Sequence, residues 1–490
     1  MAQCCDALKP SADTRLLRKR LIRRYMKLWL FRILVMLMPI ALTCSPSPAS
    51  AYSLLTHEQL IDLTWKDSIV PLLLNSYPNL THAELDRARA YAYGGCVIQD
   101  IGYYPFGDQS FSNLTHYVRS GDFVVNLFRN AHNANELAFA IGALSHYIGD
   151  SIGHSEATNL AVPIEFPKLR AKYGATVSYA EGKHQHVQTE FAFDINEIAH
   201  HRVAPLQFLR HIGLKVSTRQ LALAFYQTYG ISENFGLRRI RFVNVRDYRF
   251  ATRAFIPRIA YALTLLHRNN EPPDPTTAAV LELEKESAAV AQDNDWQAYR
   301  RKAGIGTRLL AGIIFILPKV GPLALLNIKG PTEQTEEDYA NSVAVSTTAL
   351  RRVLVRFTPE EARYKGPIPP LGSLTRPNDT SAQARDPRHP LPNRDLDTGH
   401  VVQPGGYPLT DSTYANLLHK LVQRPTQPIP PGIKSDIQSF YSNLDRPITT
   451  KKNPEQWKEV LSDLNVMASM PTSSAPEPFR TYDNDQDAGK

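Results

Sequence analysis

The stretch that decides the fold is residues 136–154, which read ELAFAIGALSHYIGDSIGH. Its apolar side chains follow helical spacing and leave almost no polar face: Leu137, Phe139, Ala140, Ile141, Leu144 and Ile148. A helix that is apolar nearly all round is buried in a protein core. We therefore expect this segment to form a central helix against which the rest of a helical domain packs.

The sequence around this segment supports the same interpretation from residue 52 to about residue 270. Helical segments are separated by short polar turns, and no sustained alternation of the strand type occurs. The sequence therefore predicts an all-α fold, a multi-helix bundle. A chain of 490 residues with 43% hydrophobic and 21% charged residues is typical of a globular protein with room for more than one domain. This composition excludes a wholly disordered or collagen-like chain.

Two further regions are expected after the helical domain of residues 52–270. Residues 271–360 predict a helical extension whose apolar run, 309–326, contains two prolines and a lysine and is better suited to a buried or membrane-touching hairpin than to a membrane span. Residues 361–490 predict a proline-rich, partly disordered extension, because 13 of the 36 prolines fall within 366–431. Within 366–431, which we expect to be an extended, surface-running or partly disordered connector, a short helix near 413–421 is the one ordered piece.

The first 51 residues are typical of a targeting segment. A basic stretch from Arg15 to Arg32 runs into an apolar run at 33–42, and small and proline residues follow, ending in Ala49-Ser50-Ala51. This is the layout of a secretory signal peptide with an A-x-A cleavage site. We expect the mature chain to begin at Tyr52 and to be secreted or periplasmic. A signal anchor is the main alternative, and Cys44 offers a weaker lipoprotein interpretation.

The net charge of +8 is concentrated in this N-terminal segment. Residues 1–51 carry nine basic and two acidic side chains, which leaves +1 for the rest of the chain. A nearly neutral remainder argues against a basic nucleic-acid-binding surface. Of the four cysteines, Cys96 alone lies beyond residue 51, so no internal disulfide is expected in the mature chain.

Histidines are concentrated in residues 57–201, which hold ten of the fifteen. Two segments place histidines and carboxylates at four-residue intervals: His146, Asp150 and His154 in the first, and His186 and Glu190 in the second. Residues at this interval project from the same stripe of a helix. Two facing helices that each offer imidazole and carboxylate groups can close a metal coordination shell. We therefore expect a metal cluster between core helices.

Asp150 adds an energetic argument. Its helix is apolar on the other faces, and burying an ionised carboxylate without a partner is prohibitively costly. Neither Lys nor Arg occurs between Asn135 and Pro167, so a divalent metal is the most economical partner within this stretch, and an arginine from elsewhere is the alternative. A single histidine of this kind is more often a hydrogen-bonded core or surface residue, but five candidates at regular spacing favour a metal site.

These motifs together resemble a known pattern. H-Y-x-G-D at residues 146–150 is followed by His154 and Asn159, and then by H-x-x-x-E at residues 186–190. Upstream lie Asp100 and His116, and His57 stands five residues after Tyr52. The order resembles that of the zinc-dependent bacterial phospholipase C family, whose fold is shared with single-strand-specific zinc nucleases. The resemblance covers about residues 52–205 and implies an all-α domain that holds three zinc ions.

The resemblance also implies which residues bind each ion. Asp100, His116, His146 and Asp150 would hold the first, His154, His186 and Glu190 the second, and Tyr52, His57 and a bridging Asp150 the third. Asp100 would also be the catalytic general base. Two departures are that three residues rather than the usual five separate Asp150 from His154, and that Tyr52 stands where tryptophan is usual. His184 is a rival of His186 for the second ion.

The function implied is hydrolysis of a phospholipid or other phosphodiester by a metal-activated water. Tyr103, Tyr104 and Phe106 are candidates for an aromatic wall around a choline-like cation, although core packing is the commoner role of such side chains. A phospholipid substrate predicts an apolar, membrane-approaching rim, for which 309–326 is the candidate. A zinc nuclease and a metal-stabilised non-catalytic secreted protein are the alternatives, with nucleic acid the less favoured substrate and no protein partner evident.

Overall fold

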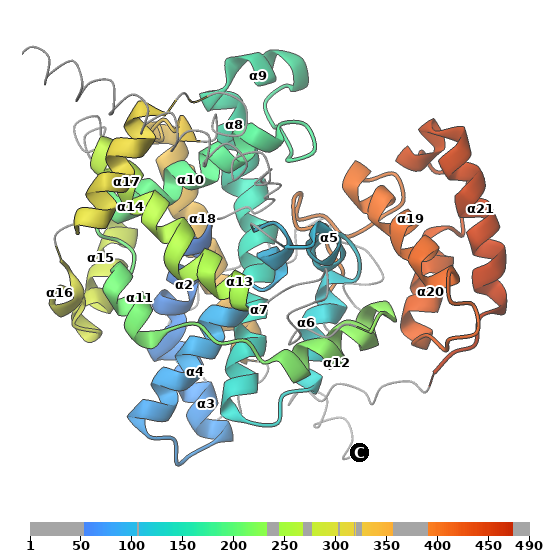
Figure 1. Ribbon diagram of the computed structural model, residues 1–490, viewed down its shortest axis with the longest axis horizontal. Helices are drawn as coiled ribbons and strands as arrows, with labels where there is room; N and C mark the ends of the chain where they lie inside the picture. Colours follow the sequence, from blue (N-terminus) through green and yellow to red (C-terminus); the bar gives the residue numbers. More distant parts are fainter. Residues whose placement is uncertain are drawn as a thin grey trace, which may run out of the picture.

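The structure is a computed structural model, which describes residues 53–104, 107–232, 245–267, 277–301, 304–317, 319, 326–355 and 391–473. These ranges contain helices and turns but no strand, and their β-type pairing is limited to the isolated bridges Arg394–Val401 and Ile429–Thr472. The prediction of an all-α fold is confirmed (Figure 1).

The stretch 136–154 forms the expected central helix. Helix α7, Ala134–Gly153, begins where the Asn133 side chain accepts a hydrogen bond from the backbone nitrogen of Glu136, and it continues into a π-helical turn, η3, His154–Thr158. Every residue of α7 from Ala138 onward is buried. The helix packs against α2 (Leu54–Thr64), α4 (His82–Gly95), α6 (Ser120–Arg129) and α18 (Glu333–Val355), which surround it in Figure 1.

Helices α4 and α7 approach each other closely enough to require glycine. A Cβ on Gly95 would lie 2.1 Å from the Phe139 carbonyl oxygen, and a Cβ on Gly142 would lie 2.2 Å from the Ala92 carbonyl oxygen. Since real carbon atoms do not come this close, the two glycines set the distance between the helix backbones. This close packing fixes the face of α7 that carries the histidines and the aspartate.

The other helices described up to residue 267 are shorter than α7. They are η1 (Trp65–Ile69), α3 (Val70–Ser76), η2 (Gln99–Gly102), α5 (Gln109–Tyr117), α8 (Asn159–Glu165), α9 (Pro167–Tyr173), α10 (Lys183–Ala199), α11 (Leu206–Ile212), α12 (Thr218–Tyr229), α13 (Val245–Phe250), η4 (Ala251–Phe255) and α14 (Ile256–His267). Of these, η2, α5 and α10 supply side chains to the candidate site.

The predicted helical extension after residue 270 contains α15 (Ala278–Asp293), α16 (Trp296–Tyr299), α17 (Ile305–Ile316) and α18. Helix α18 is joined to the first helix of the domain: the Tyr339 hydroxyl donates a hydrogen bond to Gln59 Oε1 and lies 2.9 Å from the hydroxyl of Thr56. The expected hairpin at 309–326 is only partly described, since 318 and 320–325 lie outside the described residues.

The helix expected near 413–421 is confirmed, but residues 391–473 are more ordered than the partly disordered extension that we expected. This part of the chain forms α19 (Pro408–Val422), α20 (Pro431–Phe440), η8 (Thr449–Lys452) and α21 (Pro454–Ser469), grouped at one end of the molecule in Figure 1. The rings of Tyr414 and Phe440 stack 3.8 Å apart between α19 and α20. Leu396 belongs to the same buried apolar cluster as Leu144 of α7.

Proline content misled the prediction because proline is compatible with helix starts. Pro408, Pro431 and Pro454 stand in the first turns of α19, α20 and α21. A proline there loses no hydrogen bond, since the first amides of a helix have no partner within it. The prediction for 361–390 and 474–490 lies outside the described residues.

Candidate metal centre

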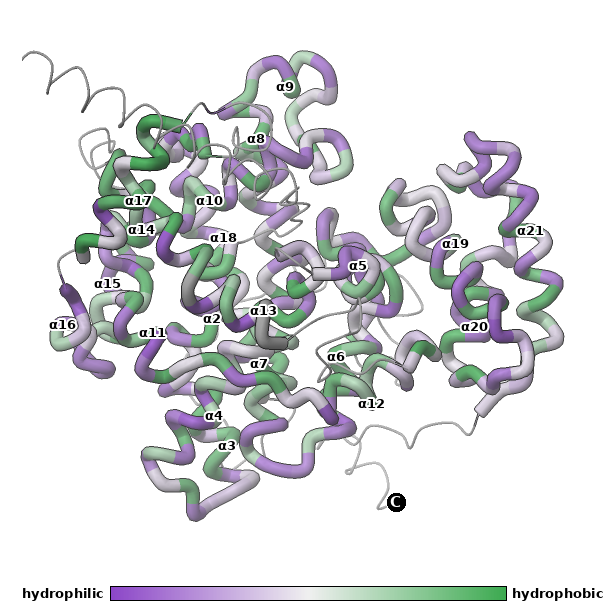
Figure 2. Tube along the Cα trace, in the orientation of Figure 1, coloured by the Kyte–Doolittle hydropathy of each residue, from purple (hydrophilic) through white to green (hydrophobic). Residues whose placement is uncertain are grey.

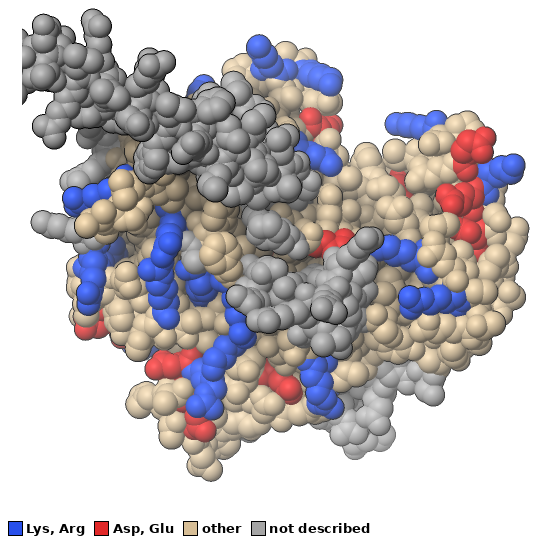
Figure 3. Space-filling model, viewed as in Figure 1, with Lys and Arg blue, Asp and Glu red and all other residues tan. Residues whose placement is uncertain are grey.

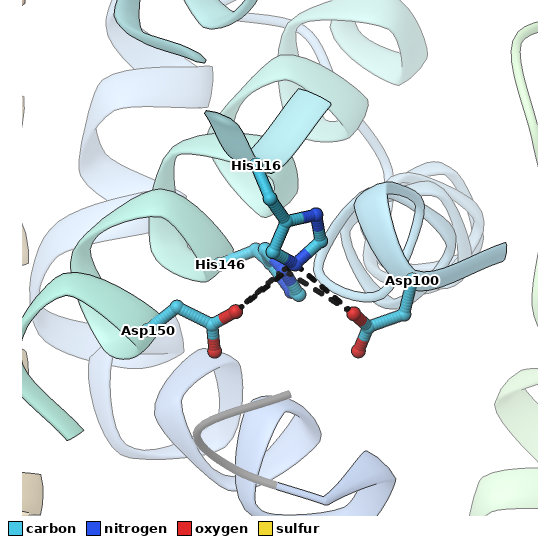
Figure 4. A group of neighbouring side chains, drawn as sticks. All are labelled: Asp100, His116, His146 and Asp150. Carbon is cyan, nitrogen blue, oxygen red and sulfur yellow. Dashed lines mark hydrogen bonds and ion pairs between the residues drawn. The ribbon is translucent and has the colours of Figure 1, made fainter. Parts of the chain in front are cut away.

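Four of the predicted ligands meet in one buried group. Asp100 comes from η2, His116 from α5, and His146 and Asp150 from α7, and one donor atom of each lies within 4.8 Å of the others (Figure 4). His116 Nε2 is 3.3 Å from Asp100 Oδ1 and 3.3 Å from Asp150 Oδ2. His146 Nε2 is 3.1 Å from the same Asp150 oxygen.

Both histidines of this group are oriented by backbone carbonyl groups. The Nδ1 of His116 lies 2.8 Å from the Ser112 oxygen, and the Nδ1 of His146 lies 2.9 Å from the Cys96 oxygen. When each neutral ring donates its Nδ1 N–H there, the two Nε2 atoms, 3.4 Å apart, present lone pairs to the centre of the group. Two lone pairs do not bond each other, so this arrangement suits a cation between them.

Asp150 connects this group to the N-terminal helix. Its Oδ1 lies 3.2 Å from Nε2 of His57, which is the fourth residue of α2. The His57 ring also stacks on the His146 ring, with centroids 4.2 Å apart. The two oxygens of Asp150 therefore face different imidazoles, the arrangement expected of a carboxylate that bridges two ions. Tyr52, the remaining predicted ligand on this side, lies outside the described residues.

The electrostatics of the first group follow from burial and opposite charges. Burial alone would raise the pKa of Asp150, but the imidazoles of His146, His116 and His57 hold that pKa well below its usual range. Burial likewise opposes protonation of His116, yet without a bound ion hydrogen bonds to Asp100 and Asp150 raise its pKa to about 10, so a proton stands on Nε2 where a cation would replace it. The carboxylate of Asp150 is thus held ionised and available to a cation.

A second group brings together His154, His186 and Glu190, again with donor atoms within 4.8 Å of one another. His154 stands at the start of η3, and the other two residues lie on α10. His186 Nε2 lies 2.7 Å from the Val177 carbonyl oxygen, which leaves its Nδ1 3.6 Å from Glu190 Oε1. His184, the rival of His186, is exposed.

The second group would accept a cation readily. Burial and the neighbouring His154 lower the pKa of His186 to about 3, so that imidazole is neutral and can act as a ligand. Burial and the charges of Asp150 and Asp100 raise the pKa of Glu190 well above its usual value. A bound divalent ion would reverse the penalty on Glu190. Imidazole and carboxylate donors without thiolate are the set found in hydrolytic zinc sites, so both groups fit zinc.

The start of α2 is held in place by a buried carboxylate on α10. Asp194 accepts hydrogen bonds from the backbone nitrogens of Leu55 and Thr56, at 3.0 and 3.1 Å, and from the Thr56 hydroxyl at 2.9 Å. These contacts satisfy amides that have no partner within the helix. They also position His57 one residue further along.

The three aromatic candidates for a substrate wall are placed as follows. Tyr103 is 4% exposed and packs with Tyr179 and Val187, and its ring lies 5.2 Å from that of His116. Tyr104 is half-buried and stacks on Tyr248, with ring centroids 6.2 Å apart. Phe106 lies outside the described residues. A role for these residues in binding a head group stays a prediction.

One buried acidic residue near the second group was not anticipated. Asp397 Oδ1 lies 3.9 Å from His154 Nε2, and both side chains are fully buried. Asp397 belongs to a proline-rich stretch without helical periodicity, far along the chain from the other candidates. No local spacing signal marks it, and only the fold brings it to the site.

The comparisons with known proteins agree with this geometry. Residues 56–234 match a family model described as zinc dependent phospholipase C. No curated protein and no solved structure matches the chain. The matched range contains His57 and all of the ligand candidates that the two groups bring together. Residues 56–234 therefore belong to the zinc-dependent phospholipase C family.

Proposed function

We propose that the chain is an exported phospholipase C that uses three zinc ions to split the phosphodiester of a phospholipid between glycerol and phosphate. The observation that carries the proposal is the pair of buried ligand groups together with Asp150, whose two oxygens face His57 on one side and His116 and His146 on the other. This arrangement supports two adjoining ions at Asp150 and a third at the group of His154.

Zinc bound in such sites supplies Lewis acidity, which activates water and offsets negative charge on phosphate oxygens. The protein contributes by orienting the ligand side chains and by keeping water away from them. The ligand side chains of both groups are at most 3% exposed, so electrostatic interactions among them are screened little by water. Backbone carbonyl groups fix the imidazoles, so that little reorganisation is needed when a charged group binds.

Asp100 is proposed as the group that takes the proton from the attacking water. Figure 4 shows one of its carboxylate oxygens turned toward His116 and His146 and the other turned away from them. The first oxygen, Oδ1, lies 3.3 Å from His116 Nε2 and suits a ligand. The second, Oδ2, is the atom that would accept the proton, as a general base must lie within reach of the water.

A phospholipid substrate is favoured by the surface of α17. Ile305, Leu309, Phe315 and Ile316 are between 63% and 80% exposed, and Figure 2 shows this helix as a strongly hydrophobic segment. Contiguous exposed apolar side chains mark sites of contact with membranes or proteins. We propose that α17 touches the lipid surface. Within the described ranges no helix is long and apolar enough to cross a membrane.

The surface offers less support for a nuclease. On the face shown in Figure 3, the described Lys and Arg side chains are interspersed with Asp and Glu. Single-strand nucleases need a positively charged groove that follows the nucleic-acid backbone. The near-neutral charge beyond residue 51 points the same way.

The proposed function is tested by hydrolysis assays on the purified protein with zinc and with a chelator. We expect release of diacylglycerol from phosphatidylcholine vesicles, loss of this activity with the chelator, and none on single-stranded DNA. His186→Ala should abolish the activity, whereas His184→Ala, an exposed histidine two residues away, should leave it intact. Cleavage of DNA but not of lipid would identify a nuclease, and cleavage of neither would favour a non-catalytic protein.

Export is the second part of the proposal. Cleavage after Ala51 would leave Tyr52 as the first residue, directly before Ser53, which is 8% exposed and adjoins the buried helix that carries His57. By the resemblance to the family, a free amino group at Tyr52 is a proposed ligand of the third zinc. Mass spectrometry of the exported protein tests the cleavage point. Extra residues before Tyr52 should lower zinc content, and an unchanged zinc content would contradict the N-terminal ligand.

A further inference from the structure

A segment outside the matched family range crosses the metal centre. The backbone nitrogen of Leu396 donates a hydrogen bond to the His116 carbonyl oxygen at 3.1 Å, and Asn159 Nδ2 donates one to the Asp397 carbonyl oxygen at 2.9 Å. His154 Nδ1 lies 2.9 Å from the Leu396 carbonyl oxygen. These contacts hold the backbone around Asp397 against residues of both metal groups.

The two oxygens of the Asp397 carboxylate have different surroundings. Oδ2 accepts hydrogen bonds from the hydroxyls of Tyr117, at 2.8 Å, and Tyr407, at 2.6 Å. Oδ1 has no hydrogen-bond partner in the described ranges, although the side chain is fully buried, and it lies 3.9 Å from His154 Nε2. Leaving a buried carboxylate oxygen unsatisfied is costly, so this oxygen needs a partner that the described side chains do not supply.

Three neighbouring donor atoms of the second group also lack a hydrogen-bond partner within the described part of the chain. His154 Nε2, His186 Nδ1 and Glu190 Oε1 are all buried and without a hydrogen-bond partner among the described residues. The other nitrogen of each imidazole is already committed to a carbonyl oxygen, so the inward nitrogens carry lone pairs rather than protons. Donor atoms of His154, His186 and Glu190 lie within 4.8 Å of one another, and Asp397 Oδ1 lies 3.9 Å from His154 Nε2, so a cation bound at this group is a partner that all four side chains could share.

We infer that Asp397 Oδ1 is a fourth protein ligand of the second zinc ion, donated by residues 391–402 from outside the family range. The inference rests on the proposed function, since the second group must hold zinc. Two imidazole nitrogens and two carboxylate oxygens would together supply the number and kind of donors that zinc accepts. The hydroxyls of Tyr117 and Tyr407 orient the carboxylate, as outer-shell partners of metal ligands do. Residues 391–402 are then part of the metal centre.

The test is zinc affinity in the purified mature protein. Asp397→Asn keeps an oxygen for the tyrosine hydroxyls and removes the ligand charge. We expect wild type to hold three zinc ions and the variant to lose one, with at least about 100-fold weaker affinity, the upper end of the cost of losing an outer-shell partner. The matched control is Asp436→Asn, which removes a carboxylate that also accepts a tyrosine hydroxyl, from Tyr414, but lies outside both groups.

A second variant reports coordination directly. Asp397→Cys places a thiol at the same position, and in protein loaded with Co²⁺ a thiolate ligand gives a near-ultraviolet charge-transfer absorption that wild type lacks. Appearance of this band supports the inference. Unchanged zinc affinity of Asp397→Asn, or the absence of the band, would overturn it while leaving the zinc enzyme in place. Failure of wild type to bind zinc at all would instead overturn the proposed function.

Discussion

Asp150 shares its two carboxylate oxygens between imidazoles on different elements, with Oδ1 facing His57 and Oδ2 facing His116 and His146. Asp150→Asn keeps the size of the side chain but replaces one of these oxygens by an amide that cannot bind a cation. We expect the variant to lose at least one zinc ion per chain and its hydrolysis rate to fall at least about 100-fold. This is the upper end of the cost of mutating a residue that only hydrogen-bonds to a metal ligand. Elemental analysis and the lipid assay on one preparation check this. A variant with full zinc content would show that Asp150 is not a ligand.

Asp194 gives a prediction about pH. Burial raises its pKa from 3.8 to about 6, against the opposing hydrogen bonds from Leu55, Ser53 and Thr56. Between these values the folded protein keeps a proton that the unfolded chain releases, so this group's contribution to stability is complete below about pH 4 and is lost as the pH rises to about 6. Two pKa units correspond to roughly 3 kcal/mol, taken as an upper bound.

Denaturant unfolding at several pH values checks the effect of Asp194. Asp194→Asn does not titrate at this position. Between pH 4 and pH 6, the free energy of unfolding of wild type should therefore fall relative to that of the variant. Other titrating groups, such as Glu58, cancel in this difference. A constant difference across the range would show that Asp194 keeps an ordinary pKa in the folded protein.

What the sequence reveals of the site depends on how far apart the ligands lie along the chain. His146 and Asp150, and likewise His186 and Glu190, were found because four-residue spacing is a local property of one helix. Asp100, His116 and His57 were identified only through the resemblance to a family, since nothing local joins them to α7. Asp397 stands 280 residues after Tyr117, its hydrogen-bond partner, and could be found only from the fold.

At the scale of elements, apolar buried helices could be predicted from the sequence, but most of the helices in the last third of the chain could not. Helix α7 was identified by its composition, and Gly95 and Gly142 give a reason for its close packing that composition does not contain. The helix near 413–421 was expected, but α20 and α21 were missed because proline count was treated as a sign of disorder. The positions of Pro408 and Pro431 within helical first turns carry the opposite information.

The segment that carries Asp397 depends on Gly399 for its approach to α7. Gly399 has φ +69°, and a Cβ there would lie 2.2 Å from the Ser151 carbonyl oxygen. Gly399→Ala should therefore push residues 391–402 away from the helix and weaken retention of the second zinc ion. The backbone conformation alone costs about 1–2 kcal/mol for a residue with a side chain, and the collision adds to it.

Gly213→Ala is the matched control for this prediction. Gly213 also has positive φ, +82°, but no described atom would lie within 4 Å of a Cβ added there, so only backbone strain is introduced. Thermal unfolding and zinc titration of both variants separate the two effects. We expect backbone strain in both proteins but a loss of zinc affinity only in Gly399→Ala. Equal zinc affinities would mean that the segment need not contact α7 for metal binding.

At the scale of the whole molecule, the core around the candidate metal centre includes far more of the chain than the matched residues 56–234. One buried apolar cluster extends from Leu54 to Met470, so the C-terminal helices share a core with the zinc-binding helices. Helix α18 is held to the same structure by the ion pair of Arg202 with Glu336, in which both side chains are at most 2% exposed. Removing the C-terminal part would therefore open the core as well as the second metal group.

The surface of the molecule supports a last prediction, about lipid binding. Phe315 and Ile316 at the end of α17 are 73% and 74% exposed. Burying each such side chain in lipid contributes up to about 1.5–3 kcal/mol, so Phe315→Ser with Ile316→Ser should weaken binding to phosphatidylcholine vesicles at least about tenfold. Leu281→Ser, which removes a side chain that is 52% exposed on α15, is the control and should bind as wild type does.

Cosedimentation with vesicles measures the binding, and a short-chain phosphatidylcholine in free solution measures the chemistry. Because α17 supplies none of the metal ligands, the double variant should hydrolyse the soluble substrate at the wild-type rate and lose activity only on vesicles. If both activities fall together, α17 affects the metal centre through the fold. If neither falls, the apolar face of α17 serves something other than lipid, and the contact with the membrane must be made elsewhere on the molecule.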